Sequence, residues 1–215
     1  MAPVAPTLRG QLFIWTDIDP AHEPDFNRWY DREHMQERMG IPGFLRARRF
    51  RALVAGPRRY LALYDTESLA VFRTSEYQKA FAQQTDWSRR NFARMRDTQR
   101  RVGGLTVDEG QGEGGALALF VFDGLDRSAA RLAPNFRDTV ERDHVIRASL
   151  LETEVDLSAP LSAGAAPARA DMVAMVEATD ADAASAAADH LARRLAVDVQ
   201  DGVVHVFRSL WRLGT

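Results

Sequence analysis

His34 is the side chain in this sequence best suited to moving a proton. It closes the segment Phe26-Asn-Arg-Trp-Tyr-Asp-Arg-Glu-His34, and Pro24 and Gly40 bracket a helix predicted over residues 25–39. Tyr30, His34 and Arg38 form a stripe on one side of this helix, beside apolar Phe26 and Trp29. We expect the imidazole at the margin of the core, in reach of solvent, where it could act as an acid or base near neutral pH. The alternative is a structural histidine that hydrogen-bonds the helix end or the next turn.

Two aspartates could assist this histidine. Asp31 precedes His34 by three residues and could orient its ring, whereas Glu33 and Glu37 are expected to face water. Asp17 shares a strand face with Trp15, so it should point into an apolar layer, where it needs a cationic partner or a raised pKa. The alternative for Asp17 is a strand end already in solvent.

Aromatic and basic residues of the first half predict a small-molecule pocket. Six arginines crowd one predicted hairpin, and although most should be solvated, Arg48 could clamp a carboxylate. The predicted substrate-binding residues are Trp15, Trp29, Tyr30, Arg48 and Tyr64. Tyr64 and the other aromatic residues could equally be plain core.

Several motifs for other chemistry are missing or out of context. The chain has no cysteine, and its five histidines lack metal-ligand spacing, so no metal site is predicted. The glycine-rich stretch over residues 110–115 precedes a strand where a dinucleotide site needs a helix, and it is interpreted as a linker. No cofactor is therefore expected, although one histidine would suffice as an axial haem ligand, which leaves haem open.

Composition narrows the class of protein and its partners. The 215 residues are 46% hydrophobic with a net charge of −2, which argues against a disordered chain or a polybasic nucleic-acid binder. The longest apolar run, Ala116–Phe122, is too short to span a membrane, and the N-terminus lacks the pattern of a secretory signal. We expect a cytoplasmic protein with a small-molecule ligand, no nucleic-acid or membrane partner, and homodimerisation left open.

Strand and helix patterns repeat once along the chain. The order β-α-β-β-α-β is predicted over residues 1–110 and again over 111–215, which we take as two ferredoxin-like repeats. The first repeat has strands at 11–19, 44–54, 59–64 and 99–108, and helices at 25–39 and 67–95, the latter broken near 83–86. The second has strands at 116–122, 147–157, 171–178 and 203–213, and helices at 128–145 and 181–196. Each sheet leaves an apolar face bare, so the predicted fold is α+β, with the two repeats packed sheet to sheet as an intramolecular α+β barrel.

The motif around His34 resembles a known family. Together with Ile41-Pro-Gly-Phe44 and Ala47-Arg-Arg-Phe50, it is similar to EthD-like members of the dimeric α+β barrel superfamily. The resemblance implies the barrel fold, and the superfamily includes isomerases, monooxygenases and haem enzymes. His144 falls where His34 does, but the Pro-Gly-aromatic turn is replaced in the second repeat. We therefore expect one site, in the first repeat, and a degenerate second repeat.

These observations lead to two functional hypotheses. The first is a cofactor-independent isomerase or lyase acting on a small, partly apolar carbonyl or carboxylate compound, such as an aromatic-catabolism lactone or a polyketide-like molecule. His34 would transfer the proton with help from Asp31 or Asp17. The second is a non-catalytic small-molecule-binding or accessory protein that uses the same pocket, so whether the chain is an enzyme stays open.

Overall fold

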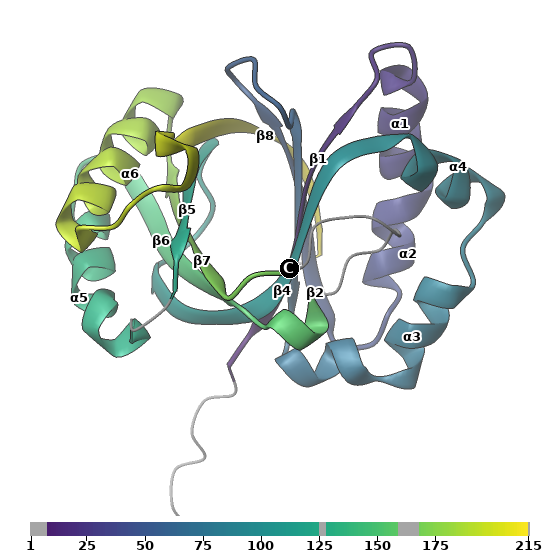
Figure 1. The fold of residues 1–215 in the computed structure, drawn as a ribbon, viewed down its shortest axis with the longest axis horizontal. Helices are drawn as coiled ribbons and strands as arrows, with labels where there is room; N and C mark the ends of the chain where they lie inside the picture. The colour runs from purple at the N-terminus through teal and green to yellow at the C-terminus, as the bar shows by residue number, and fades with distance from the viewer. Residues whose placement is uncertain (1–7, 125–127, 159–167, 215) are drawn as a thin grey trace, which may run out of the picture.

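Eight antiparallel strands close into a barrel in the computed structural model, which describes residues 8–124, 128–158 and 168–214 (Figure 1). Around the barrel the strands follow the order β1-β3-β2-β8-β5-β7-β6-β4. Their bounds are β1 Gly10–Ile18, β2 Phe44–Ala52, β3 Tyr60–Thr66, β4 Met95–Gly110, β5 Ala116–Asp123, β6 Val145–Thr153, β7 Asp171–Ala178 and β8 His205–Gly214. The predicted order of strands and helices in both repeats is confirmed.

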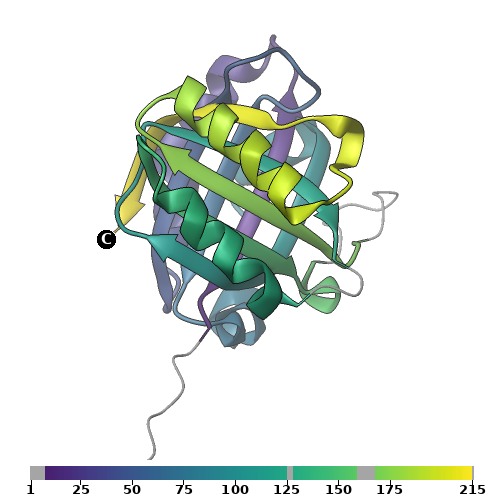
Figure 2. The same cartoon turned by 90° about the vertical axis from the view of Figure 1, so that its left-hand side faces the viewer.

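Helices cover the barrel on two opposite sides. The first repeat contributes α1 (Glu23–Trp29), the π-helical turn η1 (Tyr30–His34), α2 (Met35–Met39), the 3-10 turn η2 (Leu69–Arg73), α3 (Ser75–Ala82) and α4 (Asp86–Arg94). The second contributes α5 (Ala129–Val140), α6 (Ala181–Leu195) and the short turns η3 (Val155–Leu157) and η4 (Gln200–Gly202). Figure 2 shows α5 and α6 lying side by side across the strands of the second repeat. Among the described residues, no helix is both long and apolar enough to cross a membrane.

The repeats exchange their last strands to close the barrel. β4 pairs with β1 of its own repeat and with β6 of the other, and β8 pairs with β5 and also with β2. The 16 residues of β4 give it the length to pair with both neighbours. At Gly103 the backbones approach so closely that a Cβ atom would lie 2.0 Å from the Glu152 carbonyl oxygen. The two predicted sheets are therefore one continuous hydrogen-bonded sheet.

Two predicted helices are interrupted for identifiable reasons. The helix predicted over 25–39 contains the π turn η1, in which the Met35 amide donates to the Tyr30 carbonyl five residues earlier. The helical stretch after β3 breaks as predicted, because Thr85 caps α4 by accepting a hydrogen bond from the Ser88 amide at 3.0 Å. The resulting segments form the layer that covers the outer face of β1, β2 and β3.

Strand alternation divides the buried residues into three layers. Phe13 and Trp15 point into the barrel, whereas Leu12 and Ile14 of the same strand point outward to the helices of the first repeat. A third layer lies between α5, α6 and the strands of the second repeat. A site can therefore lie inside the barrel or in one of the two helix–sheet layers.

Candidate functional site

His34 lies inside the helix–sheet layer of the first repeat. Its residue surface is only 4% exposed, and its ring stacks on Trp29 with a centroid distance of 4.3 Å. Tyr30 and Tyr64 approach the same ring at 5.2 and 6.3 Å. The expectation that His34 sits at a solvent-facing margin is wrong, because α4 covers the helix that carries it and places Phe92 5.4 Å from the imidazole. We call Trp29, Tyr30, His34, Arg38 and Tyr64 the His34 cluster.

The environment of His34 keeps its imidazole neutral. Burial lowers the pKa of His34 well below 6.5, and the positive charges of Arg38 and Arg49 lower it further. Nδ1 is buried without a hydrogen-bond partner among the described residues, and Glu37 Oε2 lies 3.9 Å from it. Burial together with nearby Glu33 raises the pKa of Glu37, which remains partly open to solvent. A neutral base therefore lies beside a carboxyl group that reaches water.

Glu37, and not Asp31, is the carboxylate that lies beside the His34 imidazole. Asp31 accepts hydrogen bonds from Arg49 at 3.0 Å and from the Trp211 indole at 2.8 Å, and it makes no contact with the imidazole among the described residues. Buried Arg49 needs a counter-charge, and Asp31 at the edge of the layer supplies it. The prediction that Asp31 orients the His34 ring is therefore wrong in geometry, and Glu37, which the sequence placed in water, is the carboxylate at that position.

A guanidinium and two phenols complete the His34 cluster. Arg38 is 5% exposed, and its side chain forms no ion pair or hydrogen bond within the described part of the chain. Burial raises the pKa of Tyr30 and raises that of Tyr64 well above 10, so both remain protonated donors at neutral pH. The Tyr64 hydroxyl is buried beside that of Tyr30 and meets no other hydrogen-bonding group among the described residues. This dry layer thus combines a neutral base, an unpaired cation and hydroxyl donors.

The other predicted site residues lie on the far side of the sheet. Trp15 points into the barrel, where its indole donates to the Arg58 carbonyl at 3.0 Å. Arg48 is also internal and pairs with Glu177 at 2.7 Å instead of facing a substrate. The predicted pocket is therefore split by the sheet, because alternate residues of β1 and β2 point to opposite faces. Trp29, Tyr30 and Tyr64 stay together with His34.

Asp17 lies at the end of β1, beyond an irregularity in its pairing with β4. It forms an ion pair with Arg59 at 2.7 Å, which is the cationic partner that its position called for. The pair is partly exposed and Arg59 also binds Glu23. No described contact joins Asp17 to the His34 cluster, so it is not brought together with the histidine.

The second repeat offers no counterpart to this cluster. His144 is exposed in the turn between α5 and β6, with a backbone φ of 67°, and does not enter the layer beneath the helices. Alanines of α6 pack directly on the strands there, including Ala184, Ala187 and Ala188. Among the described residues, no group of three or more histidine or acidic side chains is placed to hold a metal ion.

Comparison with known proteins identifies the fold. No protein-family model matches this chain, and no curated protein matches it. An anthrone oxidase-like protein superposes with a TM-score of 0.65 at 10% identity, covering 96% of this chain and 93% of that one. A putative monooxygenase from Fusobacterium nucleatum gives 0.62 at 8% identity, with 97% and 95% covered. A haem-binding protein from Thermus thermophilus gives 0.51 at 10% identity, with 95% and 92% covered.

These comparisons overturn the expected reaction class. The named neighbours are monooxygenases, an anthrone oxidase-like protein, chlorite dismutases and a haem-binding protein, and none of these names describes an isomerase or a lyase. The hypothesis of a cofactor-independent isomerase or lyase is therefore wrong. It failed because a base beside an arginine is suited to any reaction that begins with removal of a proton. The spacing of residues in the sequence does not show which reactant the resulting substrate anion reacts with next.

Haem does not fit the histidines of either helix–sheet layer as they are packed. Four aromatic rings contact the His34 imidazole at centroid distances between 4.3 and 6.3 Å, which leaves no space for a macrocycle beside it. In the second repeat His144 is exposed, and His190 lies on α6 outside the apolar layer, which the helix alanines fill. From the superpositions, the chain has the ferredoxin-like α+β barrel fold of these neighbours, with a buried histidine cluster in its first repeat.

Proposed function

We propose that the His34 cluster is the active site of an oxidase or monooxygenase that reacts a small aromatic compound directly with O2. The substrate class is an enolisable or phenolic ring compound of the anthrone kind. One observation carries this proposal: among the described residues, a neutral imidazole with an unpartnered Nδ1 lies near a buried guanidinium that forms no ion pair. The named neighbours support the oxidative class.

The chemistry begins with an anion. His34 Nδ1 removes the acidic proton of the substrate, and Arg38 holds the enolate or phenolate oxygen that forms. Such an anion is rich in electrons and reduces O2, which the neutral compound does slowly. For an anthrone the balance is one O2 consumed: one oxygen atom becomes the new carbonyl, and the other leaves as water with two substrate hydrogens.

The remaining cluster residues orient the anion and return the proton. Tyr30 and Tyr64 keep their protons because burial raises the pKa of both hydroxyls, so they can donate hydrogen bonds to a substrate oxygen. Glu37, 3.9 Å from Nδ1 and partly exposed, gives the proton taken by His34 a route to solvent. Trp29, stacked on the imidazole, is an aromatic surface on which a ring compound could pack once the cover over the cluster has moved.

Substrate entry requires the cover to move. Thr85 at the start of α4 donates to Glu33 at 2.6 Å, and Ser88 contacts the same carboxylate at 3.2 Å. This latch joins α4 to η1 over the His34 cluster, next to the break between α3 and α4. We propose that its opening admits the substrate and that its closure excludes water from the anion.

The closer assignment to the EthD-like family is part of this proposal. It rests on the helix motif ending at His34 and on the Pro-Gly-Phe turn that follows. In the structure this motif supplies three of the five residues of the cluster: Trp29, Tyr30 and His34. The assignment implies neither a substrate nor a cofactor.

The test is oxygen uptake by the purified chain with an anthrone, without added haem, flavin or metal. We expect one O2 consumed per substrate and a quinone product detected by mass spectrometry. Tyr64→Phe removes a hydroxyl that has no described neighbour of its kind except the Tyr30 hydroxyl, so it should lower kcat by about tenfold or more while the fold is kept. Absence of uptake across a panel of anthrones and phenols, or uptake only after haem is added, would contradict the proposal.

A further inference from the structure

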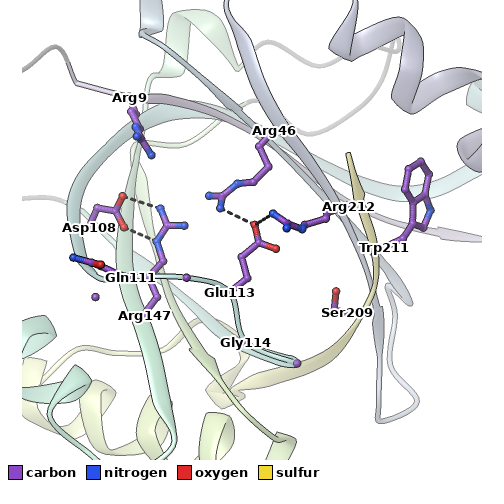
Figure 3. A pocket seen from close by; sticks show the side chains of 13 residues that line it. Arg9, Arg46, Asp108, Gln111, Glu113, Gly114, Arg147, Ser209, Trp211 and Arg212 are labelled. Carbon is purple, nitrogen blue, oxygen red and sulfur yellow. Dashed lines mark hydrogen bonds and ion pairs between the residues drawn. The ribbon is translucent and has the colours of Figure 1, made fainter. Parts of the chain in front are cut away.

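A cavity opens at one mouth of the barrel, away from the His34 cluster. It has a volume of about 810 Å³, which is in the range of small-molecule sites. The glycine-rich linker between β4 and β5 forms one wall, and the ends of β2, β6 and β8 form the others (Figure 3). The residues that line this barrel-mouth pocket are Arg9, Arg46, Asp108, Gly110, Gln111, Gly112, Glu113, Gly114, Gly115, Arg147, Ser209, Trp211 and Arg212.

The barrel-mouth pocket carries more positive than negative charge. Its lining contains four arginines and two carboxylates, which leaves a net charge of +2. Arg147 is held by Asp108 through two hydrogen bonds of 2.6 and 2.7 Å. Glu113 accepts from Arg46 at 2.8 Å and lies 3.4 Å from Arg212. The carboxylates are therefore already shared among three of the arginines.

Arg9 is the one arginine of the pocket lining that pairs with neither of its carboxylates. Its guanidinium points toward the pocket in Figure 3 and forms no ion pair or hydrogen bond within the described part of the chain. A ligand could therefore be bound from two sides. The Arg9 guanidinium is a planar donor on one side, and the outer nitrogens of the paired arginines are donors on the other. An anion placed between them would contact Arg9 without breaking an existing pair.

The floor beneath the pocket neutralises part of this charge, because Asp65 pairs with Arg46 of the lining, and the charge of Arg9 is left unpaired among the described residues. Asp65 is buried and occupied by Arg46 and Gln11, and Glu177 is occupied by Arg48 and the Gly114 amide. Nearby arginines lower the pKa of Asp65, so it is already charged. Gln11 Oε1 and Arg48 Nε are nevertheless buried without partners, which shows that the polar network of the floor is incomplete.

We propose that the barrel-mouth pocket binds a compact oxyanion of the carboxylate or phosphate kind. An anion matches the positive charge that remains at Arg9, and carboxylate and phosphate oxygens match the planar fork of arginine. The site is separate from the oxidative chemistry proposed above, so each can fail without the other.

Calorimetric titration of the full chain with succinate and with inorganic phosphate tests this inference, against sodium chloride at matched ionic strength. We expect saturable binding of at least one dianion and none of chloride. Binding of succinate alone or phosphate alone supports the site and identifies its ligand class. Absence of saturable binding by both would overturn it.

Variants locate the binding. Arg9→Gln removes a side chain that has no partner among the described residues, so the unfolding temperature without ligand should not change, while affinity should fall about tenfold. Arg193→Gln on exposed α6, which also has no described side-chain partner, is the matched control and should bind as the wild type does. Equal affinity in Arg9→Gln and the wild type would overturn the assignment to this pocket.

Discussion

The helix–sheet layers of the two repeats have the same topology but are filled by side chains of different size and polarity. In the second repeat, small alanines of α6 lie directly on an apolar sheet, and the buried Thr139 of α5 satisfies its hydroxyl by donating to the Asn135 carbonyl at 2.7 Å. In the first repeat the corresponding space holds large aromatic rings around His34, Arg38, Arg49 and two tyrosines. Related topology therefore does not produce related interiors.

This difference has a physical cost that only one layer carries. A buried polar group without a partner costs on the order of 1–3 kcal/mol, and the described residues of the first layer include several such atoms, among them His34 Nδ1 and Asn91 Oδ1. An apolar layer of the second kind would avoid that cost. The first layer thus gives up stability to keep polar groups in a dry environment, which is typical of a site that must tune proton transfer.

The largest expected effect comes from comparing alanine variants of the two histidines, His34 and His144. His34→Ala should lower kcat for oxygen uptake by about 10²-fold or more, because it removes the base. His144→Ala, at the equivalent place in the sequence but exposed, should leave kcat within about twofold of the wild type. Equal losses in both variants, measured with an oxygen electrode, would mean that the repeats do not differ in function.

A second change tests whether the layer of the second repeat is filled. Ala188→Leu inserts a larger side chain where Ala188 has no exposed surface, so we expect a loss of about 1–3 kcal/mol in unfolding free energy. Ala186→Leu on the exposed side of the same helix is the control and should change stability by less than about 0.5 kcal/mol. A neutral Ala188→Leu in urea denaturation would reveal room for a ligand there.

The pH dependence of stability tests the buried imidazole. Because the folded pKa of His34 lies below its unfolded value of about 6.5, the unfolded chain binds the extra proton in acid. The stabilisation is present above about pH 6.5 and is lost as the pH falls toward the folded pKa, with a slope of up to about 1.4 kcal/mol per pH unit. His34→Gln should remove that slope, as followed by denaturant unfolding between about pH 5 and 7.5. An unchanged slope in the variant would mean that His34 is not the group responsible.

The smallest expected effect concerns the cover of the first layer. Thr85→Val removes the hydrogen bond to Glu33 and the cap of α4, so stability should fall by about 0.5–2 kcal/mol. If latch opening limits substrate entry, kcat/KM should rise by about twofold. Thr74→Val, which removes the corresponding cap of α3, is the control for the cap alone. A rise in kcat/KM of the same size in Thr74→Val would mean that the hydrogen bond from Thr85 to Glu33 does not control substrate entry.

The sequence predicted what depends on local pattern and failed where contacts come from distant strands. Alternation and turn residues predicted the element order and the barrel, and the helix motif brought Trp29, Tyr30 and His34 together as expected. The opposite positions of Trp15 and Arg48 depend on which face of the sheet each residue occupies. The pairing of Asp31 depends on Arg49 and on Trp211, which is 180 residues away in the sequence. Only the three-residue spacing from His34 to Glu37 could have signalled the carboxylate that was missed.

The most direct test of the proposed site is an NMR titration of the histidine ring protons, with and without a phenolic substrate analogue. We predict that His34 stays neutral well below pH 6.5 and that its signal shifts when the analogue binds, while the His144 signal does not respond to it. A His34 ring that titrates near or above 6.5, or an analogue that perturbs His144 instead, would contradict the assignment of the site to the first repeat.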